Sequence, residues 1–340
     1  LHYLHRRQRQ MCIRDSNAHG WRTPPDHLKE NRIYRKMLIG LQDYLVEETS
    51  AEWTLYHNDF SLCSRKVRIC LHETGIDYVS KHIDLIETGK YEVASEAFLK
   101  INPGATVPVL LNMGRPIYES HEQIKFIFDS KNIQKNNVES QVLIDYWTDK
   151  ASMVGNPVEG HKKYAGNTIG PLTFPLFISM IHYVPIKEIL KGLINHPMKQ
   201  RVLIFLMMKI LGFNLLKVPP IQKLIKSSFS ALNSHLKELE IELSTNNREW
   251  LASDDFTLAD ISWSVILHRL NECGWYALLI KDKPSIKNYY DKIVERPCFK
   301  KGIVNQSNPN LERGIDDLKE VIENNSFIRS FHQEINELTK

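Results

Sequence analysis

The sequence predicts a mixed α/β domain followed by an all-helical domain. Residues 53–129 alternate between short β-branched or aromatic runs and helical patterns of apolar residues, whereas strand signals are sparse beyond residue 137. The chain has 340 residues, of which 42% are apolar and 25% charged, so it is long enough for two domains with separate cores.

The first domain is organised around residues 55–71, where a strand pattern changes to a helix pattern. The turn formers Asn58 and Asp59 separate the two, and the helix is expected to begin at Ser61. The other elements follow at short intervals. We expect strands at 53–58, 77–85, 107–111 and 115–118, and helices at 61–74, 92–101 and 120–129. This β-α-β-α-β-β-α order is that of a thioredoxin-like domain, with bounds at 51–130.

After a polar linker at 130–137, the helical domain is expected over 138–305. A capping-box pair, Thr257 and Asp260, should start one of its core helices. A helical tail is expected at 306–340. The predicted helices are 138–163, 187–216, 219–245, 257–272, 284–295 and 312–338.

An apolar insert at 165–218 allows two interpretations. Residues 165–186 carry no formal charge but are interrupted by three prolines, and 202–216 is too short to span a bilayer and contains Lys209. A buried helix or groove wall is the favoured interpretation. A hairpin that binds a partner or makes peripheral contact with a membrane is the alternative.

The N-terminal residues contribute most of the formal net charge of +4. Residues 1–16 include RRQRQMCIRDS, carry a net +3 and resemble a translated sequencing adapter, so we expect them to be an artefact. Residues 17–50 are an N-terminal extension, with a helix expected at 26–47. The small remaining charge gives no reason to expect a nucleic-acid partner. Five cysteines without paired spacing predict reduced thiols in the cytoplasm and no metal site.

Three local features are candidates for a binding site. Ser61 places a hydroxyl where a strand passes into a helix, a position that suits an anion. Pro108 follows Val107 at the start of a strand. A cis peptide bond there would leave the N–H and C=O of Val107 free to pair with an extended peptide. The alternative is that Pro108 only blocks the edge of the sheet. Glu119 and Ser120 lie at the next strand-to-helix junction. Ser120, as the N-cap, could bind a carboxylate, and Glu119 could bind an ammonium. The alternative is that the pair only caps the helix.

Together these positions suit a short peptide with a thiol at one end and an amino-acid head group at the other, which describes glutathione. Residues 53–299 resemble a cytosolic glutathione S-transferase. The resemblance rests on the SLCS run, the VPVL segment, the Glu119-Ser120 pair and the FTLAD segment at 256–260. It implies a homodimer that transfers glutathione to a small hydrophobic electrophile in detoxification.

Two branches of this family share particular motifs with the chain. Ser61-Leu62-Cys63-Ser64 resembles the SSCS motif of the zeta class, which includes maleylacetoacetate isomerases, but departs from it at Leu62. Residues 256–270 and 284–299 resemble ganglioside-induced differentiation-associated proteins. A zeta-like glutathione-dependent isomerase and a non-catalytic binding or membrane-associated module are therefore the alternatives to a transferase.

As a transferase, the protein would use Ser61 to hold the glutathione thiol as a thiolate. Cys63, Val107, Pro108, Glu119 and Ser120 would bind the glutathione, with Cys63 in the pocket wall. Cys63 is also the competing reactive group, since it could form a mixed disulfide with glutathione. The three basic residues Arg65, Lys66 and Arg68 are expected to form a solvated helix face.

Overall fold

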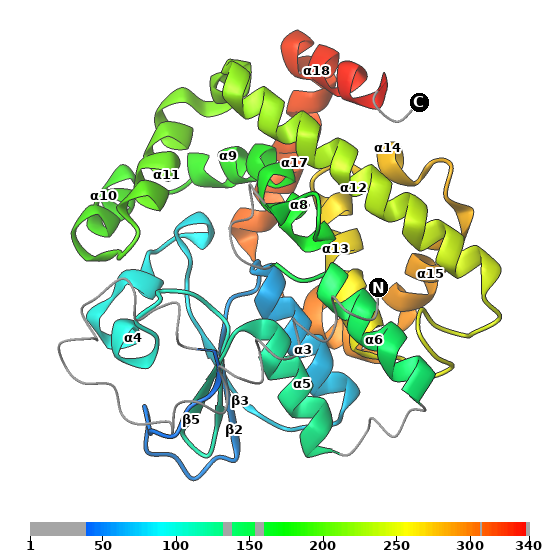
Figure 1. The fold of residues 1–340 in the computed structure, drawn as a ribbon. Coiled ribbons are helices and arrows are strands. Elements are labelled where there is room, and N and C mark those ends of the chain that lie inside the picture. Colours follow the sequence, from blue (N-terminus) through cyan, green and yellow to red (C-terminus); the bar gives the residue numbers. More distant parts are fainter. Residues whose placement is uncertain (1–38, 132–137, 154–159, 307, 338–340) are drawn as a thin grey trace.

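The computed structural model describes residues 39–131, 138–153, 160–306 and 308–337. It consists of a small domain built on one sheet and a larger domain of helices, which pack against each other (Figure 1). The expected α/β domain followed by an all-α domain is thus confirmed.

The sheet has five strands in the order β1-β5-β4-β2-β3. Its central pair, β2 and β4, is antiparallel, β3 runs parallel to β2, and β5 and β1 continue the other side with antiparallel pairing. Buried apolar side chains such as Leu55 and Leu110 make the central strands part of the core. The strands are β1 (Gly40–Leu41), β2 (Trp53–His57), β3 (Val79–His82), β4 (Val109–Asn112) and β5 (Arg115–Tyr118).

Two helices of this domain, α3 (Leu62–Glu73) and α5 (Ser120–Ser130), pack side by side (Figure 1). The segment between β3 and β4 holds the short 3₁₀ helices η2 (Ile86–Thr88) and η3 (Glu92–Ala94) and the helix α4 (Glu96–Ile101). The single helix predicted at 92–101 is therefore wrong. It divides because Ser95 accepts the N–H of Phe98 and caps a new helix.

In the helical domain, α13 (Leu258–Glu272) is the central element and packs against α3, α6 and α8. It is buried almost throughout, so it joins the two domains. The first half of the domain contains α6 (Val138–Lys150), α8 (Ala165–Leu172), α9 (Phe174–His182), α10 (Ile186–Asn195), α11 (Lys199–Leu211), η4 (Gly212–Lys217) and α12 (Pro219–Thr245). After α13 come α14 (Tyr276–Ile280), α15 (Pro284–Glu295), α16 (Pro297–Phe299), the π-helical η5 (Lys300–Val304), α17 (Pro309–Asn324) and α18 (Ser326–Glu337).

The helix predicted at 26–47 is wrong over its described part, residues 39–47, and residues 26–38 lie outside the described ranges. Gly40 has a φ of 71°, a left-handed conformation that a helix interior does not accommodate. Residues 40 and 41 instead pair with Tyr118 and Ile117 and add β1 to the sheet. The linker predicted at 130–137 overlaps the end of α5 at Ser130, and its residues 132–137 lie outside the described ranges, as does the artefact predicted at 1–16.

Three other predicted helices are shorter or broken. The one predicted at 187–216 is interrupted after Asn195, where Pro197 cannot continue it. The helix predicted at 312–338 begins earlier, at Pro309, and is divided into two helices at Asn325. The division occurs there because the Asn325 side chain accepts the N–H of Ile328 and caps the second helix. The one predicted at 138–163 ends as α6 at Lys150.

The apolar insert divides into a buried part and an exposed part. Helices α8 and α9 pack against α12 and α17 and are mostly buried, which confirms the core interpretation for 165–182. Helices α10 and α11 pack together as a hairpin but leave many apolar side chains exposed. No single described helix is both long and apolar enough to cross a membrane, although two sharply bent helix pairs, 165–195 and 199–245, have sufficient length and apolar composition together.

The start of α13 yields a prediction about stability. Asp260 is fully buried and accepts hydrogen bonds from the N–H groups of Thr257 (2.8 Å) and Leu251 (3.0 Å) and from the Tyr289 hydroxyl (2.7 Å), so the predicted capping box is confirmed. Asp260→Ala should lower the free energy of unfolding by about 3–5 kcal/mol, because it leaves several buried donors without an acceptor.

Urea unfolding followed by circular dichroism would measure this loss. Asp291, which pairs on an exposed helix face with Lys287 at 2.8 Å, offers a control. Asp291→Ala should cost less than about 1 kcal/mol. Equal losses for the two variants would contradict the capping role.

Candidate glutathione site

The strand register brings the three predicted site segments to one edge of the sheet. Tyr56 of β2 faces Val109 of β4, and Leu110 of β4 faces Ile117 of β5. Because both pairings are antiparallel, the residues that follow β2, precede β4 and follow β5 all emerge at the same edge. The Ser61 turn, the Val107-Pro108 segment and the Glu119-Ser120 pair are therefore neighbours.

Ser61 is the N-cap of α3, as the sequence predicts. Its Oγ accepts the N–H of Ser64 at 3.3 Å, and the side chain is half-buried. Since the oxygen is the acceptor in this bond, the hydroxyl proton remains available to another acceptor. The N–H groups of the first helical turn have no partner within the helix and add a partial positive charge. This arrangement suits a sulfur anion beside Ser61.

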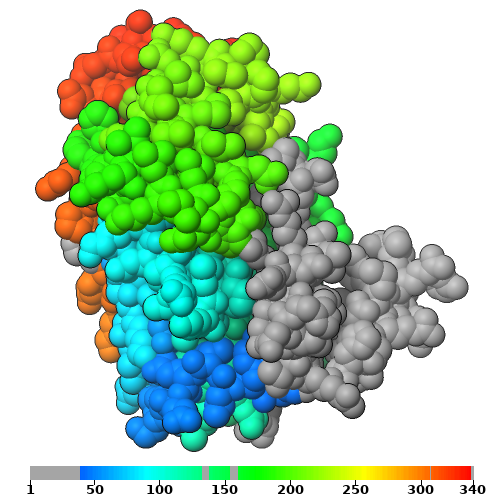
Figure 2. Space-filling view, turned by 90° about the vertical axis from the view of Figure 1, so that its left-hand side faces the viewer, coloured from blue at the N-terminus to red at the C-terminus, as the bar shows by residue number. Residues whose placement is uncertain are grey.

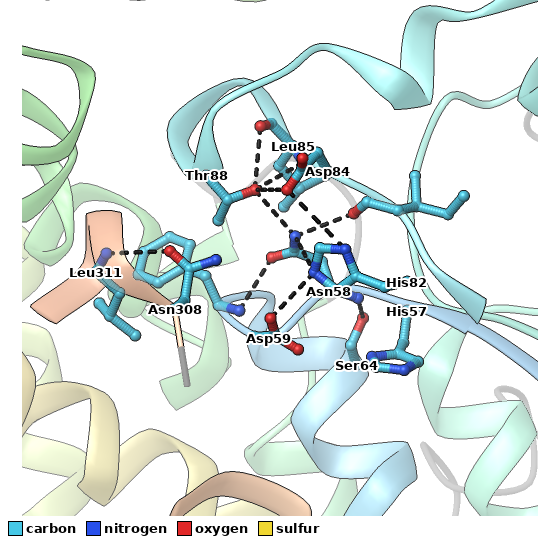
Figure 3. A network of polar contacts seen from close by, with 12 residues as sticks. His57, Asn58, Asp59, Ser64, His82, Asp84, Leu85, Thr88, Asn308 and Leu311 are labelled. Atoms are coloured by element: carbon cyan, nitrogen blue, oxygen red, sulfur yellow. Dashed lines mark hydrogen bonds and ion pairs between the residues drawn. The ribbon is translucent and has the colours of Figure 1, made fainter. Parts of the chain in front are cut away.

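Asn58 holds the turn that leads to Ser61 (Figure 3). Its Oδ1 accepts the N–H groups of Phe60 (2.9 Å) and Ser61 (3.3 Å). Its Nδ2 donates to the Ile83 carbonyl and to the Thr88 hydroxyl, each at 3.0 Å. Asn58 is fully buried, so it ties the turn to the segment after β3. The sequence identified Asn58 only as a turn former.

An ion pair lies beside this junction (Figure 3). His82 Nε2 is 3.0 Å from Asp59 Oδ2. The hydrogen bond that His82 donates to the Asp59 carboxylate raises the pKa of His82. Burial alone would raise the pKa of Asp59, but the bond to His82 contributes to lowering it. Asp59 is therefore held as a carboxylate one residue before Phe60.

Three guanidinium groups hold the carbonyls of the turn before Ser61. Arg68 Nη1 donates to the Asn58 carbonyl at 2.8 Å, and Arg65 Nε donates to the Asp59 carbonyl at 2.8 Å. Arg269, from α13, donates to the Phe60 carbonyl and lies 3.7 Å from the centre of the Phe60 ring. Every carbonyl of this turn is thus fixed, one of them by the helical domain.

Glu272 connects two of these arginines. Its Oε1 and Oε2 accept Nη2 and Nη1 of Arg65, each at 2.8 Å, and Oε2 lies 3.1 Å from Nε of Arg269. All three side chains are at most 7% exposed. Burial alone would raise the pKa of Glu272, but the two arginines lower it to about 2. The carboxylate is therefore ionised at neutral pH and bridges the domains.

The prediction that Arg65, Lys66 and Arg68 form a solvated helix face is wrong, because all three are at most 2% exposed. Helix α3 is covered by α5, α13, α16 and η5, so these side chains have no route to water. Arg68 Nε donates to the Gly302 carbonyl at 2.7 Å. For Lys66, burial lowers the pKa, while Cys63, Asp149 and Glu119 act in the opposite direction. Lys66 therefore interacts electrostatically with Cys63 and Glu119 of the predicted site.

The Val107-Pro108 peptide bond is cis, which confirms the sequence interpretation. The backbone of Val107 makes no hydrogen bond to another backbone group in the described ranges, so its N–H and C=O are free for an extended ligand. Gln123 of α5 donates to the carbonyls of Pro108 (3.0 Å) and Ile117 (2.7 Å). This side chain fixes the segment relative to α5.

The Glu119-Ser120 pair differs by one position from the prediction. Helix α5 begins at Ser120 itself, and Glu119 takes the N-cap position with a φ of 68°. A left-handed conformation is uncommon for glutamate, and it turns the chain sharply between β5 and α5. Ser120 is buried, whereas Glu119 is exposed. Glu119 is therefore accessible to a ligand, and the Ser120 N–H lies at the helix start.

Cys63 lies in the first turn of α3, two residues after Ser61, and is half-buried. Next to the turn, the helical domain supplies an aromatic wall. Phe177 of α9 contacts Phe60 with a ring-centre distance of 5.6 Å, and Phe205 of α11 lies 6.0 Å from Phe177. The sequence did not identify this wall. It also missed Arg269 and Glu272, whose only signal is a pair of opposite charges three apart in a largely apolar helix.

Comparison with known proteins finds two family models that match parts of the chain. The family model for the glutathione S-transferase N-terminal domain matches residues 60–130, and that for the C-terminal domain matches residues 221–301. One matched segment lies in each of the two domains of the structure. This confirms the resemblance found in the sequence. The two matched segments contain Ser61, the cis-proline segment and all of α13.

Relatives in this family have several names. The chain is 25% identical to "Glutathione S-transferase TCHQD" of Arabidopsis thaliana over 73% of this chain and 88% of that protein. It is 24% identical to a tetrachloro-p-hydroquinone reductive dehalogenase of Sphingobium chlorophenolicum over 78% of this chain and 99% of that protein. The crystal structure of the β-etherase LigF from Sphingobium sp. strain SYK-6 shares the fold, with a TM-score of 0.59, 20% identity, and coverage of 75% and 100% of the two chains.

The Glu272 network yields a second prediction. Glu272→Gln should lower the free energy of unfolding by about 3–5 kcal/mol at neutral pH, because Arg65 and Arg269 stay buried without their counter-charge. The pKa of Glu272 is about 2 in the folded state against an ordinary 4.5. Its ionic contribution is therefore complete above pH 4.5 and is lost as the pH falls towards 2.

Urea unfolding of the wild type and the variant at several pH values would test both statements, and the difference between them should shrink in acid. Glu73 provides a matched control because it pairs with Arg296 at 2.6 Å but is 22% exposed. Glu73→Gln should cost at most about 1 kcal/mol. A difference for Glu272→Gln that does not change with pH would contradict the ionic role.

Proposed function

We propose that the protein is a transferase that activates the thiol of glutathione for attack on a small hydrophobic electrophile. The observation that carries this proposal is the hydroxyl of Ser61 at the start of α3, on the same sheet edge as the free Val107 backbone and the Glu119-Ser120 pair. Glutathione has a thiol on its central cysteine, a peptide backbone, and an amino-acid head group at its γ-glutamyl end. The three segments match these parts in turn.

Each part of glutathione has a partner of suitable chemistry. Glu119 is exposed and anionic, so it can bind the ammonium of the head group, while N–H groups at the start of α5 can bind the carboxylate. The free N–H and C=O of Val107 pair with the peptide backbone. The sulfur then lies beside Ser61. The electrophile would bind against the aromatic wall of Phe177 and Phe205.

The energetics of thiol activation are sufficient without a metal or a protein base. Lowering a thiol pKa by about two units from about 8.5 needs roughly 2.7 kcal/mol of differential stabilisation. A hydrogen bond to a charged group contributes about 1.5–3 kcal/mol, and a helix start adds about 0.3–1 kcal/mol. In the reaction, the sulfur forms a bond to the electrophilic carbon, the leaving group departs with its electron pair, and the thiol proton goes to solvent.

A second candidate is reductive removal of a halogen, which the half-buried Cys63 favours. Two relatives in the family are named reductive dehalogenase and reductive dechlorinase. In such a reaction glutathione and Cys63 would be oxidised to a mixed disulfide, releasing two electrons and two protons. The substrate would lose halide, and its carbon would gain one of the protons. A second glutathione would then release Cys63.

Substitution of Ser61 tests the first candidate. Ser61→Ala should lower kcat/KM with a model electrophile by about 10- to 100-fold, since it removes a charge-assisted hydrogen bond of about 1.5–3 kcal/mol. The pH profile of the rate should move to higher pH because the thiol pKa rises. The affinity for glutathione, measured by thermal shift, should change little. Ser61→Thr, which keeps the hydroxyl, should retain most activity.

Cys63→Ser separates the two candidates. If Ser61 acts, Cys63→Ser keeps conjugation, whereas Ser61→Ala loses it. If Cys63 carries a reduction, Cys63→Ser abolishes halide release and the mixed disulfide seen by mass spectrometry, even where conjugation persists. No stabilisation of the wild type by millimolar glutathione would overturn both candidates, since ligand at 100 times its Kd adds about 2.7 kcal/mol.

We also propose that the protein is a homodimer. Helix α6 carries a stripe of apolar side chains at helical spacing, Val138, Val142 and Tyr146, which are 83%, 59% and 43% exposed. Such a stripe suits burial against a second copy. Val142→Glu should convert the dimer to a monomer in light scattering coupled to size exclusion. An unchanged mass for the variant would exclude this stripe as the interface.

A further inference from the structure

The hairpin of α10 and α11 is the most apolar exposed surface of the described residues. In α10 the exposed apolar side chains are Ile186, Leu190 and Ile194, spaced four apart along one face, and in α11 they include Leu203, Met207 and Ile210. Ile194 and Ile210 are 80% and 67% exposed. The opposite faces are buried through residues such as Ile189 and Phe205. Each helix therefore has one apolar face packed in the protein and further apolar side chains exposed to solvent.

This surface is also strongly basic. Residues 186–217 contain six Lys or Arg residues and one acid, Glu188, a net charge of +5, so the rest of the chain carries a net −1. Glu188 is only 14% exposed and pairs with Lys191 at 2.8 Å. Lys187, Lys199 and Lys217 are exposed. The positive charge thus belongs to the same segment as the exposed apolar side chains.

The hairpin lies at the edge of the molecule, where another surface can reach it. Helices α10 and α11 are the outermost elements on the left of Figure 1, and their residues cover the middle of the face shown in Figure 2. The hairpin is attached to the glutathione domain through a ring contact between Tyr91 and His196 at 5.2 Å. This contact packs the start of the α10–α11 connection against that domain.

We propose that this hairpin docks the protein on an anionic membrane surface. Exposed isoleucine, leucine and methionine side chains with a lysine-rich surround are the composition of helices that lie in the lipid interface. The helices have 10 and 13 residues, about 15 and 20 Å long at 1.5 Å per residue, which is too short for a hydrocarbon core of about 30 Å. They would lie along the surface with their apolar side chains among the acyl chains.

Charge complementarity selects lipid over the two other occupants of such a surface. A second copy of the chain would bring a second +5 segment to the first if the contact were symmetric, and this would repel it. An anionic headgroup layer attracts each basic residue near it with about a fivefold gain in binding. A protein partner would need an acidic, apolar face of its own, and nothing in this chain specifies one.

Vesicle co-sedimentation with the full chain tests the proposal. The protein should sediment with phosphatidylcholine vesicles that contain phosphatidylserine, and bind at least tenfold more weakly to phosphatidylcholine alone. Added salt should weaken binding, because it screens the lysines over about 8 Å at physiological ionic strength. Absence of binding to the anionic vesicles would overturn the proposal.

A matched pair of variants locates the contact. The double variant Ile194→Glu/Ile210→Glu changes two exposed side chains of the hairpin and should lose at least tenfold in vesicle binding. Ile241→Glu changes an equally exposed isoleucine, 63% accessible, near the end of α12, and should bind as the wild type does. Both should keep the wild-type circular dichroism.

Equal binding by the double variant and the wild type would overturn the assignment to the hairpin. So would a wild-type oligomer that the double variant dissociates in the absence of lipid, since the hairpin would then be a contact between copies. Activity with glutathione is not part of this test, so the result is independent of the proposed reaction.

Discussion

The structure depends on one buried carboxylate, Glu272, held between Arg65 and Arg269. Burying these charges is costly, and the attraction between them offsets that cost only where the hydrogen bonds are nearly complete. Here Arg65 also donates to the carbonyl of Asp59, and Arg269 donates to the carbonyl of Phe60. Consequently the contact that joins the two domains also sets the backbone before Ser61. The helical domain is required for the geometry of the site as well as for covering it.

The hydrophobic residues of the insert serve two different surfaces. Helices α8 and α9 are apolar because they fill the space between α12 and α17, and their side chains are mostly buried. Helices α10 and α11 bury one face and expose an equally apolar one. Apolar composition alone therefore does not distinguish a core helix from a surface helix in this insert. The packing of each helix distinguishes them. Phe205 of α11 belongs to the aromatic wall beside the site, so the hairpin and the site share one packed unit.

Local chemistry explains what the sequence could predict. Ser61 as an N-cap, the cis bond before Pro108 and the Thr257-Asp260 capping box each depend on residues within a few positions of one another, and all three are confirmed. The local sequence places Arg65 in solvent, because it gives no sign of a buried partner. That partner, Glu272, is 207 residues away along the chain. Apolar spacing alone predicts the helix at 26–47, and strand β1 at Gly40–Leu41 contradicts it. Local spacing cannot predict this strand, because it forms by pairing with Tyr118 of a distant element.

The charges behind the Ser61 turn favour an anion in front of it. The charged side chains behind the turn comprise three arginines and two carboxylates. They are Arg65, Arg68, Arg269, Glu272 and Asp59. Together they carry an excess of one positive charge, without counting His82. The helix start adds a partial positive charge of the same sign. A thiolate at Ser61 would therefore be stabilised by the field of the turn and by the hydroxyl proton together. A neutral thiol would gain nothing from the field, and this difference in charge is what lowers a pKa.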